Sequence, residues 1–164
     1  MVQFGSADPL DAVMVDSKIC KGIGKILTHD STNNKVDLTA AGEVAIGVSV
    51  GESERDSERN MDITAAKVSF MPLGGVLMIQ CAAGLTLTTG VTLYAGADGL
   101  ATTSNASSAK KIGLYVGKGL DPTPALVDSG AGDKLTNAGA AGNGTTELTE
   151  GVMVPVMTAG AEIA

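Results

Sequence analysis

Few residues of this chain are suited to catalysis, because it has one histidine and two cysteines among 164 residues. The segment Gly47-Val-Ser-Val-Gly51 matches the Gly-x-Ser-x-Gly pattern that surrounds the nucleophilic serine of many hydrolases. In those enzymes the acid and the histidine follow the serine in the chain, whereas His29 precedes Ser49. We therefore expect Ser49 to lie in an ordinary strand between two glycines, without a catalytic role.

Two further short patterns resemble binding motifs. Gly22-Ile-Gly-Lys25 is similar to part of a phosphate-binding loop, but that motif needs glycine and a hydroxyl residue at the positions that Ile19 and Ile26 occupy. His29 and Asp30 form an adjacent pair of metal-ligand types, yet a transition-metal site usually gathers several such ligands. We expect His29 in a solvent-facing turn and neither a phosphate loop nor a metal pair.

The acidic residues cluster in one charged segment, residues 52–62. Glu52, Glu54, Asp56 and Glu58 alternate there and offer oxygen ligands of the kind that calcium prefers, but the segment lacks the spacing of an EF-hand and its arginines compete for the carboxylates. We interpret residues 52–62 as a solvated surface loop. We predict no catalytic residue, no cofactor and no metal, and hence a protein that is not an enzyme.

The sequence pattern around these residues predicts short β-strands. Apolar and polar residues alternate with a period of two, glycines and Asn or Asp residues separate the runs, and no stretch shows a trustworthy helical period. Asp98-Gly99 supplies positive-φ residues for a tight turn. The strand segments that we expect are residues 12–15, 19–27, 35–38, 43–50, 61–70, 76–81, 84–90, 91–94, 100–103, 111–116 and 151–157.

Two of these segments carry specific expectations. Val76–Cys81 is continuously apolar except for Gln80, which predicts a strand buried on both faces. Pro155 predicts that the last strand is irregular or lies at a sheet edge. Ile46-Gly-Val-Ser-Val-Gly51 also resembles Ile112-Gly-Leu-Tyr-Val-Gly117, with an offset of 66 residues. We favour two similar core strands over a duplication, because short matches of common residues arise by chance.

Composition excludes some classes of protein. The formal net charge of −7 argues against a nucleic-acid binder, which needs a basic face, and against docking on an anionic membrane. No apolar run reaches the length of a membrane span, and residues 1–20 lack the pattern of a secretory signal. We therefore expect synthesis in a cytoplasm. Cys20 and Cys81 could form one disulfide by number, but that compartment favours two free thiols.

The segment Val68–Ala109 is almost uncharged, because Asp98 is its single formal charge in 42 residues, where the chain average of 18% predicts seven or eight. Interface cores are depleted in charge, and neutral strands exposed to water tend to aggregate. We therefore expect the strands of this segment to lie in the hydrophobic core, either without a further role or with a second role in a contact between subunits. The interface residues that we predict are Val76, Met78, Leu85, Leu87, Val91, Leu93 and Tyr94.

The length suits one domain. We expect residues 1–164 to form a single all-β domain, a compact barrel-like arrangement of short antiparallel strands. Residues 121–150 are rich in Gly, Ala and Thr, and we interpret them as a long loop or an extended arm of low complexity.

The order of these features resembles the capsid decoration, or cement, proteins of tailed bacteriophages, in particular their small β-barrel or β-tulip kind. The resemblance rests on Ala45-Ile-Gly-Val48, Gly74-Gly-Val-Leu-Met-Ile79, Gly90-Val-Thr-Leu-Tyr94, Ile112-Gly-Leu-Tyr115 and Gly151-Val-Met-Val-Pro-Val156, and it covers roughly residues 40–157. These motifs are glycine and aliphatic patterns without a catalytic signature. Residues 52–62 and 121–150 look like insertions relative to shorter members of the family.

The resemblance implies a function and partners. Such proteins form homotrimers on the outer capsid surface, contact several copies of the major capsid protein and stabilise the shell, so the expected location is the virion. Several modest contacts made together give a high avidity. Two alternatives stay open: another virion structural protein, such as a tail-tube subunit or a head-fibre base, and an all-β enzyme.

Overall fold

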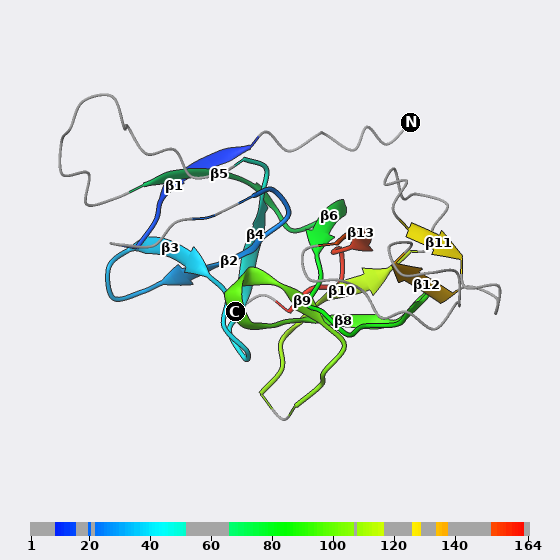
Figure 1. The fold of residues 1–164 in the computed structure, drawn as a ribbon. Helices are drawn as coiled ribbons and strands as arrows, with labels where there is room; N and C mark the ends of the chain where they lie inside the picture. The colour runs from blue at the N-terminus through cyan, green and yellow to red at the C-terminus, as the bar shows by residue number, and fades with distance from the viewer. Residues whose placement is uncertain are drawn as a thin grey trace, which may run out of the picture.

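The regular elements of the described residues are strands, apart from one short 3-10 turn, as the alternation of the residues predicts (Figure 1). The computed structural model describes residues 9–15, 20, 22–51, 66–106, 108–116, 126–128, 134–137 and 152–162. Among these residues two five-stranded antiparallel sheets form the body of the protein. The expectation of an all-β fold of short antiparallel strands is confirmed.

The first sheet holds the strands of the N-terminal part of the chain. Its order is β1, β5, β4, β2, β3, with the bounds Leu10–Val13, Lys67–Pro72, Ala45–Ser49, Ile26–Asp30 and Lys35–Leu38. The sheet curls until its two outer strands meet, because Met14, just after β1, forms a single parallel bridge with Val36 of β3. The ladder is not closed beyond this bridge.

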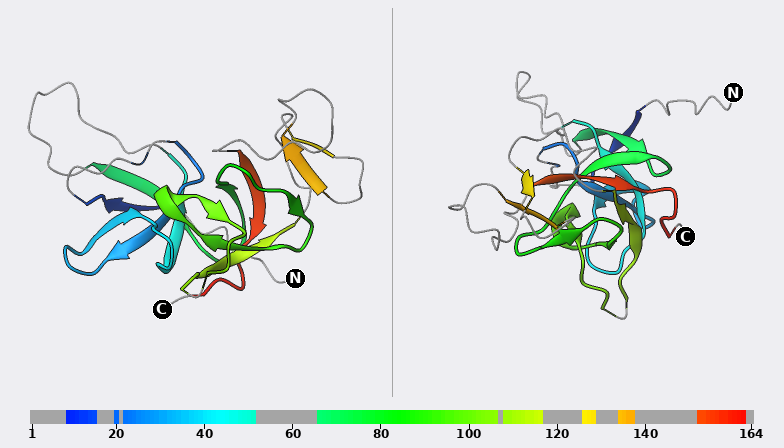
Figure 2. Two further views of the ribbon diagram at one scale, coloured as in Figure 1. Left: turned by 60° about the horizontal axis from the view of Figure 1, so that its bottom comes forward. Right: turned by 90° about the vertical axis from the view of Figure 1, so that its right-hand side faces the viewer.

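The second sheet repeats this arrangement. Its order is β6, β13, β10, β8, β9, with the bounds Val76–Gln80, Met153–Met157, Lys111–Tyr115, Thr92–Ala95 and Ala101–Thr102. Its outer strands also meet at one parallel bridge, between Cys81 and Ala101. In Figures 1 and 2 the blue-to-cyan strands of the first sheet lie to one side, and the strands of the second sheet lie beside them.

The two sheets are two copies of one unit. Numbered along the chain within each sheet, the strands have the same spatial order: first, fifth, fourth, second, third. The starts of β2 and β8, and of β4 and β10, lie 66 residues apart. We call β1–β5 the first repeat, and β6, β8, β9, β10 and β13 the second repeat.

The pairing of residues repeats with the same offset. Ile26 pairs with Val48 in the first repeat, and Thr92 pairs with Leu114 in the second. Both ladders then shift register at the same place, before the pairs Thr28–Ala45 and Tyr94–Lys111.

Hydrogen bonds outside the ladders repeat as well. Gly24 N–H donates to the carbonyl of Ser49 at 2.8 Å, and Gly90 N–H donates to that of Tyr115 at 2.7 Å. The structure therefore supports a duplication, which the similarity of the two six-residue segments did not favour by itself.

Each repeat has its own hydrophobic interior, and the repeats also pack on each other. Successive strand residues point to opposite faces of a sheet. Leu27 accordingly lies in the smaller core cluster with Met14, Val36 and Val68, whereas Ile26 lies in the larger cluster of the second repeat. This larger cluster also takes in Ala45 and Val48 of the first repeat, so the outer face of β2 and β4 covers the second repeat.

Polar contacts join the repeats at the two ends of this seam. Thr39, which follows β3, donates from Oγ1 to the carbonyl of Gly96 at 3.3 Å, and its own carbonyl accepts from Gly99 N–H at 3.1 Å. Gly99 belongs to the short 3-10 turn η1 (Ala97–Gly99), where Asp98 and Gly99 have the positive φ that their types predict. At the other end, Gln80 N–H donates to the carbonyl of Gly24 at 2.8 Å.

Pro155 lies in a strand with neighbours on both sides, because β13 runs between β6 and β10. The expectation of an edge strand is therefore wrong. The ladder with β10 covers two residue pairs, and the Pro155 carbonyl accepts from Val116 N–H just after them. The N–H and C=O of one residue point to the same side of an antiparallel strand, so the ring nitrogen of Pro155 also faces β10. It lies just past the last residue pair of this ladder, where the strand can do without a hydrogen-bond donor.

The segment 121–150, expected as a loop or arm, contributes two short strands. β11 (Leu126–Asp128) pairs with β12 (Lys134–Asn137), and β12 pairs with β7 (Leu87–Thr88) in a third, three-stranded sheet. The rest of that segment and the charged segment 52–62 lie outside the described residues.

Candidate functional site

Ser49 is a structural residue of the first repeat. Its side chain is buried, its Oγ donates to the carbonyl of Gly22 at 3.1 Å, and it accepts from the N–H of Lys25 at 2.9 Å. Both partners are backbone groups of the segment that precedes β2, so the hydroxyl fastens that segment to the end of β4. This arrangement gives Ser49 a role in holding the segment 22–25.

The segment Gly22-Ile-Gly-Lys25 is shaped by contacts within the protein. The Gly24 N–H and carbonyl are both used, toward Ser49 and Gln80, and Lys25 Nζ donates to the carbonyl of Asp98 at 3.2 Å. The lysine thus reaches across the seam to the turn of the second repeat. The segment serves as a joint between the repeats.

His29 is exposed, as expected, but it lies in strand β2, where it pairs with Val36, and not in the turn. Asp30 is the last residue of that strand. His29 Nε2 lies 3.1 Å from Asn34 Oδ1, and both residues are exposed. Asp30 accepts from the side chain of Asn33 and from the N–H of Thr32, and these hydrogen bonds lower the pKa of its carboxyl group. The carboxylate therefore stabilises the turn.

No group of three or more His, Cys, Asp or Glu side chains able to hold a metal occurs among the described residues. Cys20 and Cys81 are both buried and are not joined in a disulfide. Burial raises the pKa of the Cys81 thiol to about 12, which makes a reactive thiolate unfavourable. The calcium candidates Glu52, Glu54, Asp56 and Glu58 lie outside the described residues.

An apolar hollow of about 120 Å³ lies between β6 and the ends of β4 and β5. Its walls come from segments that are distant in the sequence and that meet at the seam between the repeats. No charged side chain lines it; the lining residues are Ile23, Gly24, Val48, Ser49, Val50, Met71, Leu77, Met78 and Met153.

Exposed apolar side chains surround this hollow. Among the described residues five large hydrophobic side chains are exposed, and four of them lie on or beside β6 and its neighbour β13. Ile23 (49% exposed) and Val50 (40%) border the hollow, while Val76 (48%) and Met157 (45%) form a cross-strand pair at the start of β6. We call the surface of Ile23, Val50, Val76, Met78, Met153 and Met157 the β6 face.

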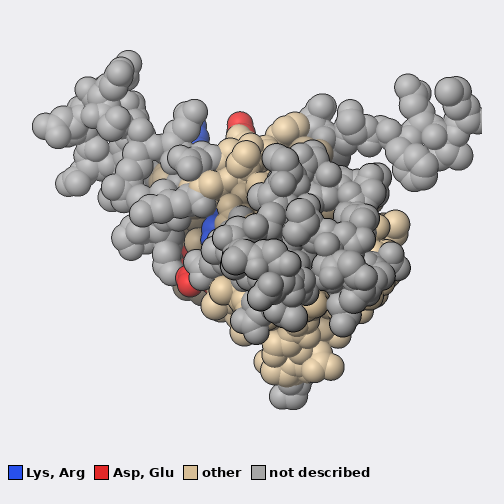
Figure 3. All heavy atoms as spheres, turned by 45° about the vertical axis from the view of Figure 1, so that its right-hand side comes forward, with Lys and Arg blue, Asp and Glu red and all other residues tan. Residues whose placement is uncertain are grey.

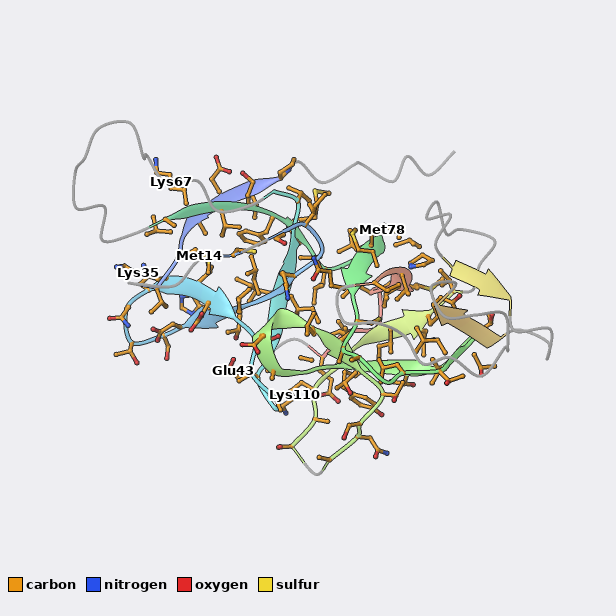
Figure 4. The ribbon with its side chains drawn as sticks, viewed as in Figure 1. Met14, Lys35, Glu43, Lys67, Met78 and Lys110 are labelled. Atoms are coloured by element: carbon orange, nitrogen blue, oxygen red, sulfur yellow. The ribbon has the colours of Figure 1, made fainter. Side chains whose placement is uncertain are left out.

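None of the six residues of the β6 face carries a formal charge. In Figure 4 Met78 stands apart from Lys35, Glu43, Lys67 and Lys110. In Figure 3 the described atoms that can be seen belong mostly to uncharged residues, drawn in tan.

β6 also presents an open backbone edge. It is the outer strand of its sheet, with β13 on one side and the segment 23–24 beside Gln80 on the other. Residues two apart in a strand point their N–H and C=O groups in the same direction. Val76 therefore points its groups to the open side, where no strand of the described structure pairs with it, while the carbonyl of Met78 lies against Gly24. The expectation that this strand is buried on both faces is wrong, because Val76 is half exposed.

The first repeat shows what the same positions hold when they face water. By the pairing with β5 and β13, Met78 and Pro155 correspond to Asp11 and Ser69. Asp11 is exposed and accepts a hydrogen bond from the Ser69 hydroxyl. The shared fold therefore accommodates polar residues at these two positions, whereas Met157 corresponds to an apolar residue of the first repeat, Met71.

The structure divides the predicted interface residues. Leu85, Leu87 and Leu93 are buried in the larger core cluster of the chain. Val91 and Tyr94 are half-buried, and Val76 and Met78 belong to the β6 face. Sequence reasoning missed Ile23, Val50, Met153 and Met157, which come from segments that only the fold brings to β6.

No family model, no curated protein and no solved structure matches this chain. Within the described ranges, no helix has the length and apolar character that crossing a bilayer requires. The exposed apolar residues of the β6 face themselves indicate an interaction surface.

Proposed function

We propose that this protein is a structural virion protein, a decoration protein that binds the outer capsid surface of a tailed bacteriophage as a homotrimer and stabilises the shell. The observation that carries the proposal is the uncharged, apolar β6 face with its open strand edge, on a chain whose net charge is −7. Exposed apolar patches of this kind mark contact surfaces.

The proposal assigns no reaction, cofactor, nucleic acid or membrane to the chain. Its partners are further copies of itself and the major capsid protein, and its place is the virion after synthesis in the host cytoplasm. The acidic remainder supports this role, because excess charge of one sign keeps particles from adhering to each other. The all-β fold fits a rigid binding module.

A shell-binding experiment tests the proposal. Purified protein is added to expanded capsids that lack their decoration layer, and binding is followed by co-sedimentation and by the temperature at which the shells break. We expect saturable binding and a higher disruption temperature. Protein that stays in the supernatant at every concentration contradicts the proposal.

The alternative virion roles predict different assemblies in electron micrographs. A tail-tube subunit forms rings or tubes in negative-stain electron micrographs, and a head-fibre base binds at few positions on a shell. A decoration protein covers the shell in a regular array. Electron micrographs of the shells therefore separate the three roles.

A further inference from the structure

We propose that the β6 face is a site of methionine oxidation, where hydrogen peroxide converts Met78, Met153 and Met157 into sulfoxides. The modification removes the apolar character of the face and leaves the fold intact. The inference rests on the proposed function in one respect, because we expect the oxidised face to lose affinity for the shell. The chemistry at the three sulfur atoms does not depend on that function.

Methionines gather on this side of the molecule. Of the five methionines that the structure describes, Met71, Met78 and Met153 line the apolar hollow. Met157 lies beside them and is 45% exposed. The fifth, Met14, is fully buried in the core of the first repeat. The same chain therefore holds accessible thioethers at one surface and an inaccessible one as an internal reference.

The register of β6 and β13 brings three of these side chains onto one face. Successive residues of a strand point to opposite faces, and Val154 is fully buried, so Met153 and Met157 both point outward. Met78 pairs with Pro155, midway between these two methionines, and is the diagonal neighbour of both. Diagonal neighbours lie about 7–8 Å apart, within reach of long side chains. Oxidation of the three sulfurs therefore changes one continuous patch.

The reaction needs only the thioether and the peroxide. The sulfur donates a lone pair to one oxygen atom of the peroxide, an S–O bond forms and the O–O bond breaks. The departing hydroxide takes up the proton of the transferred oxygen and leaves as water. The sulfur loses two electrons and the peroxide gains them, and a flexible apolar side chain becomes a polar one.

The internal duplication indicates that the fold tolerates this change. Met78 and Met153 correspond to Asp11 and Lys67 of the first repeat, which are exposed and charged. A backbone that accommodates a carboxylate and an ammonium group at these positions also accommodates sulfoxides. Met157 is 45% exposed, so water can hydrate its sulfoxide oxygen. Oxidation therefore alters the surface and not the core.

Peroxide mapping of the full chain tests the inference. The protein is treated with hydrogen peroxide for increasing times, catalase stops the reaction, and mass spectrometry of peptides measures the oxygen taken up at each methionine. We expect Met157 to react first and Met78 and Met153 to follow. Met14 should react at least about tenfold more slowly than Met157, because its thioether is buried. The circular dichroism spectrum should stay unchanged while the face is oxidised.

A matched variant isolates the role of the sulfur atoms. Met78→Leu, Met153→Leu and Met157→Leu together keep the face apolar at similar side-chain volume. The fluorescent dye anilinonaphthalene sulfonate reports exposed apolar surface, and co-sedimentation with undecorated shells reports binding. Peroxide should lower both signals for the wild type, with shell binding weakened by about tenfold or more, and leave both nearly unchanged for the triple variant.

Reversal of the modification gives a further readout. Methionine sulfoxide reductases, with a dithiol as the reductant, return sulfoxides to thioethers while the dithiol becomes a disulfide and the oxygen leaves as water. Treatment of the oxidised wild type should restore both dye binding and shell binding. Signals that stay low after complete reduction of the sulfoxides contradict the inference.

Each result decides the inference. Oxidation of Met14 at the rate of Met157, or loss of secondary structure as oxygen is taken up, overturns it. Unchanged dye binding after complete oxidation of the face, or equal losses in the wild type and the triple variant, also overturns it. If untreated protein does not bind shells, the proposed function fails, while the oxidation map and the dye signal still decide this inference.

Discussion

Gly47 and Gly113 hold the same position in the two repeats, and each allows the backbone of a neighbouring strand to come too close for a side chain. A Cβ at Gly47 would overlap the carbonyl oxygen of Met71, and a Cβ at Gly113 would overlap that of Met157. Met71 and Met157 are themselves corresponding residues of β5 and β13. The duplicated unit therefore repeats its tightest backbone contact along with its strand order.

This relationship predicts the effect of alanine at the two glycines. Gly47→Ala and Gly113→Ala should each lower the free energy of unfolding by about 1–3 kcal/mol, because the added methyl group overpacks a site bounded by backbone. Chemical denaturation monitored by circular dichroism measures the change. Gly75→Ala is the control, since a Cβ there meets nothing within 4 Å. Equal stability of all three variants contradicts the close approach.

Ser49→Ala tests the structural role of the serine in the hydrolase-like pattern. The substitution removes a hydroxyl that donates to the Gly22 carbonyl and accepts from the Lys25 N–H, both partly buried. We expect a loss of about 1–3 kcal/mol in the free energy of unfolding. Ser104→Ala, at an exposed position, should change stability by less than about 0.5 kcal/mol. A Ser49→Ala variant as stable as wild type would refute this role.

Thr158 positions the start of β6 and offers a further test. Its buried Oγ1 accepts from the N–H of Gly74 at 2.9 Å and of Gly75 at 3.2 Å, and donates to the Gly75 carbonyl at 2.8 Å. Thr158→Val keeps the shape but removes the acceptor of the two N–H groups, while the Gly75 carbonyl keeps its hydrogen bond from the Thr158 N–H. We expect a loss of about 0.5–1.5 kcal/mol in the free energy of unfolding.

Thr158→Ser is the matched control, because it retains the hydroxyl. It should lose less stability than Thr158→Val in the same denaturation experiment. If the serine variant is the less stable of the two, packing of the methyl group matters more than the hydrogen bonds.

The buried thiol of Cys81 predicts both low reactivity and a dependence of stability on pH. Burial raises its pKa from 9.0 to about 12, so the folded protein keeps the thiol protonated while the unfolded chain releases the proton above pH 9. The free energy of unfolding is therefore unaffected by this group below pH 9. It falls between pH 9 and 12, by up to about 1.4 kcal/mol per pH unit.

Two measurements check this prediction. Iodoacetamide at pH 8.5 should label position 81 in denaturant but not in the folded protein. Denaturation curves from pH 8 to 10.5 should show a steeper loss of stability for wild type than for Cys81→Ala. Parallel curves for the two proteins would show that the thiol is not the group responsible.

Local patterns were enough to predict most strands. Lys35–Leu38 has the expected bounds, and the segments expected at 43–50 and 111–116 contain β4 and β10. The segment 19–27 was wrong as one strand, because Gly22 and Gly24 adopt positive φ and β2 begins only at Ile26. Alternation reports which residues suit a pleated sheet, but it does not show where a chain turns aside to meet a distant partner.

The sequence by itself determined the all-β class and the uncharged character of Val68–Ala109, because both follow from residue types within short windows. Only the tertiary structure decided that Leu87 and Leu93 are core while Val76 and Met157 face outward, and that Ile23 and Val50 join them. Only the fold also showed that the similar segments beginning at Ile46 and Ile112 belong to a duplicated unit. The physical reason is that strand pairing and packing join residues far apart in the chain, and many side chains fill equivalent positions of one fold.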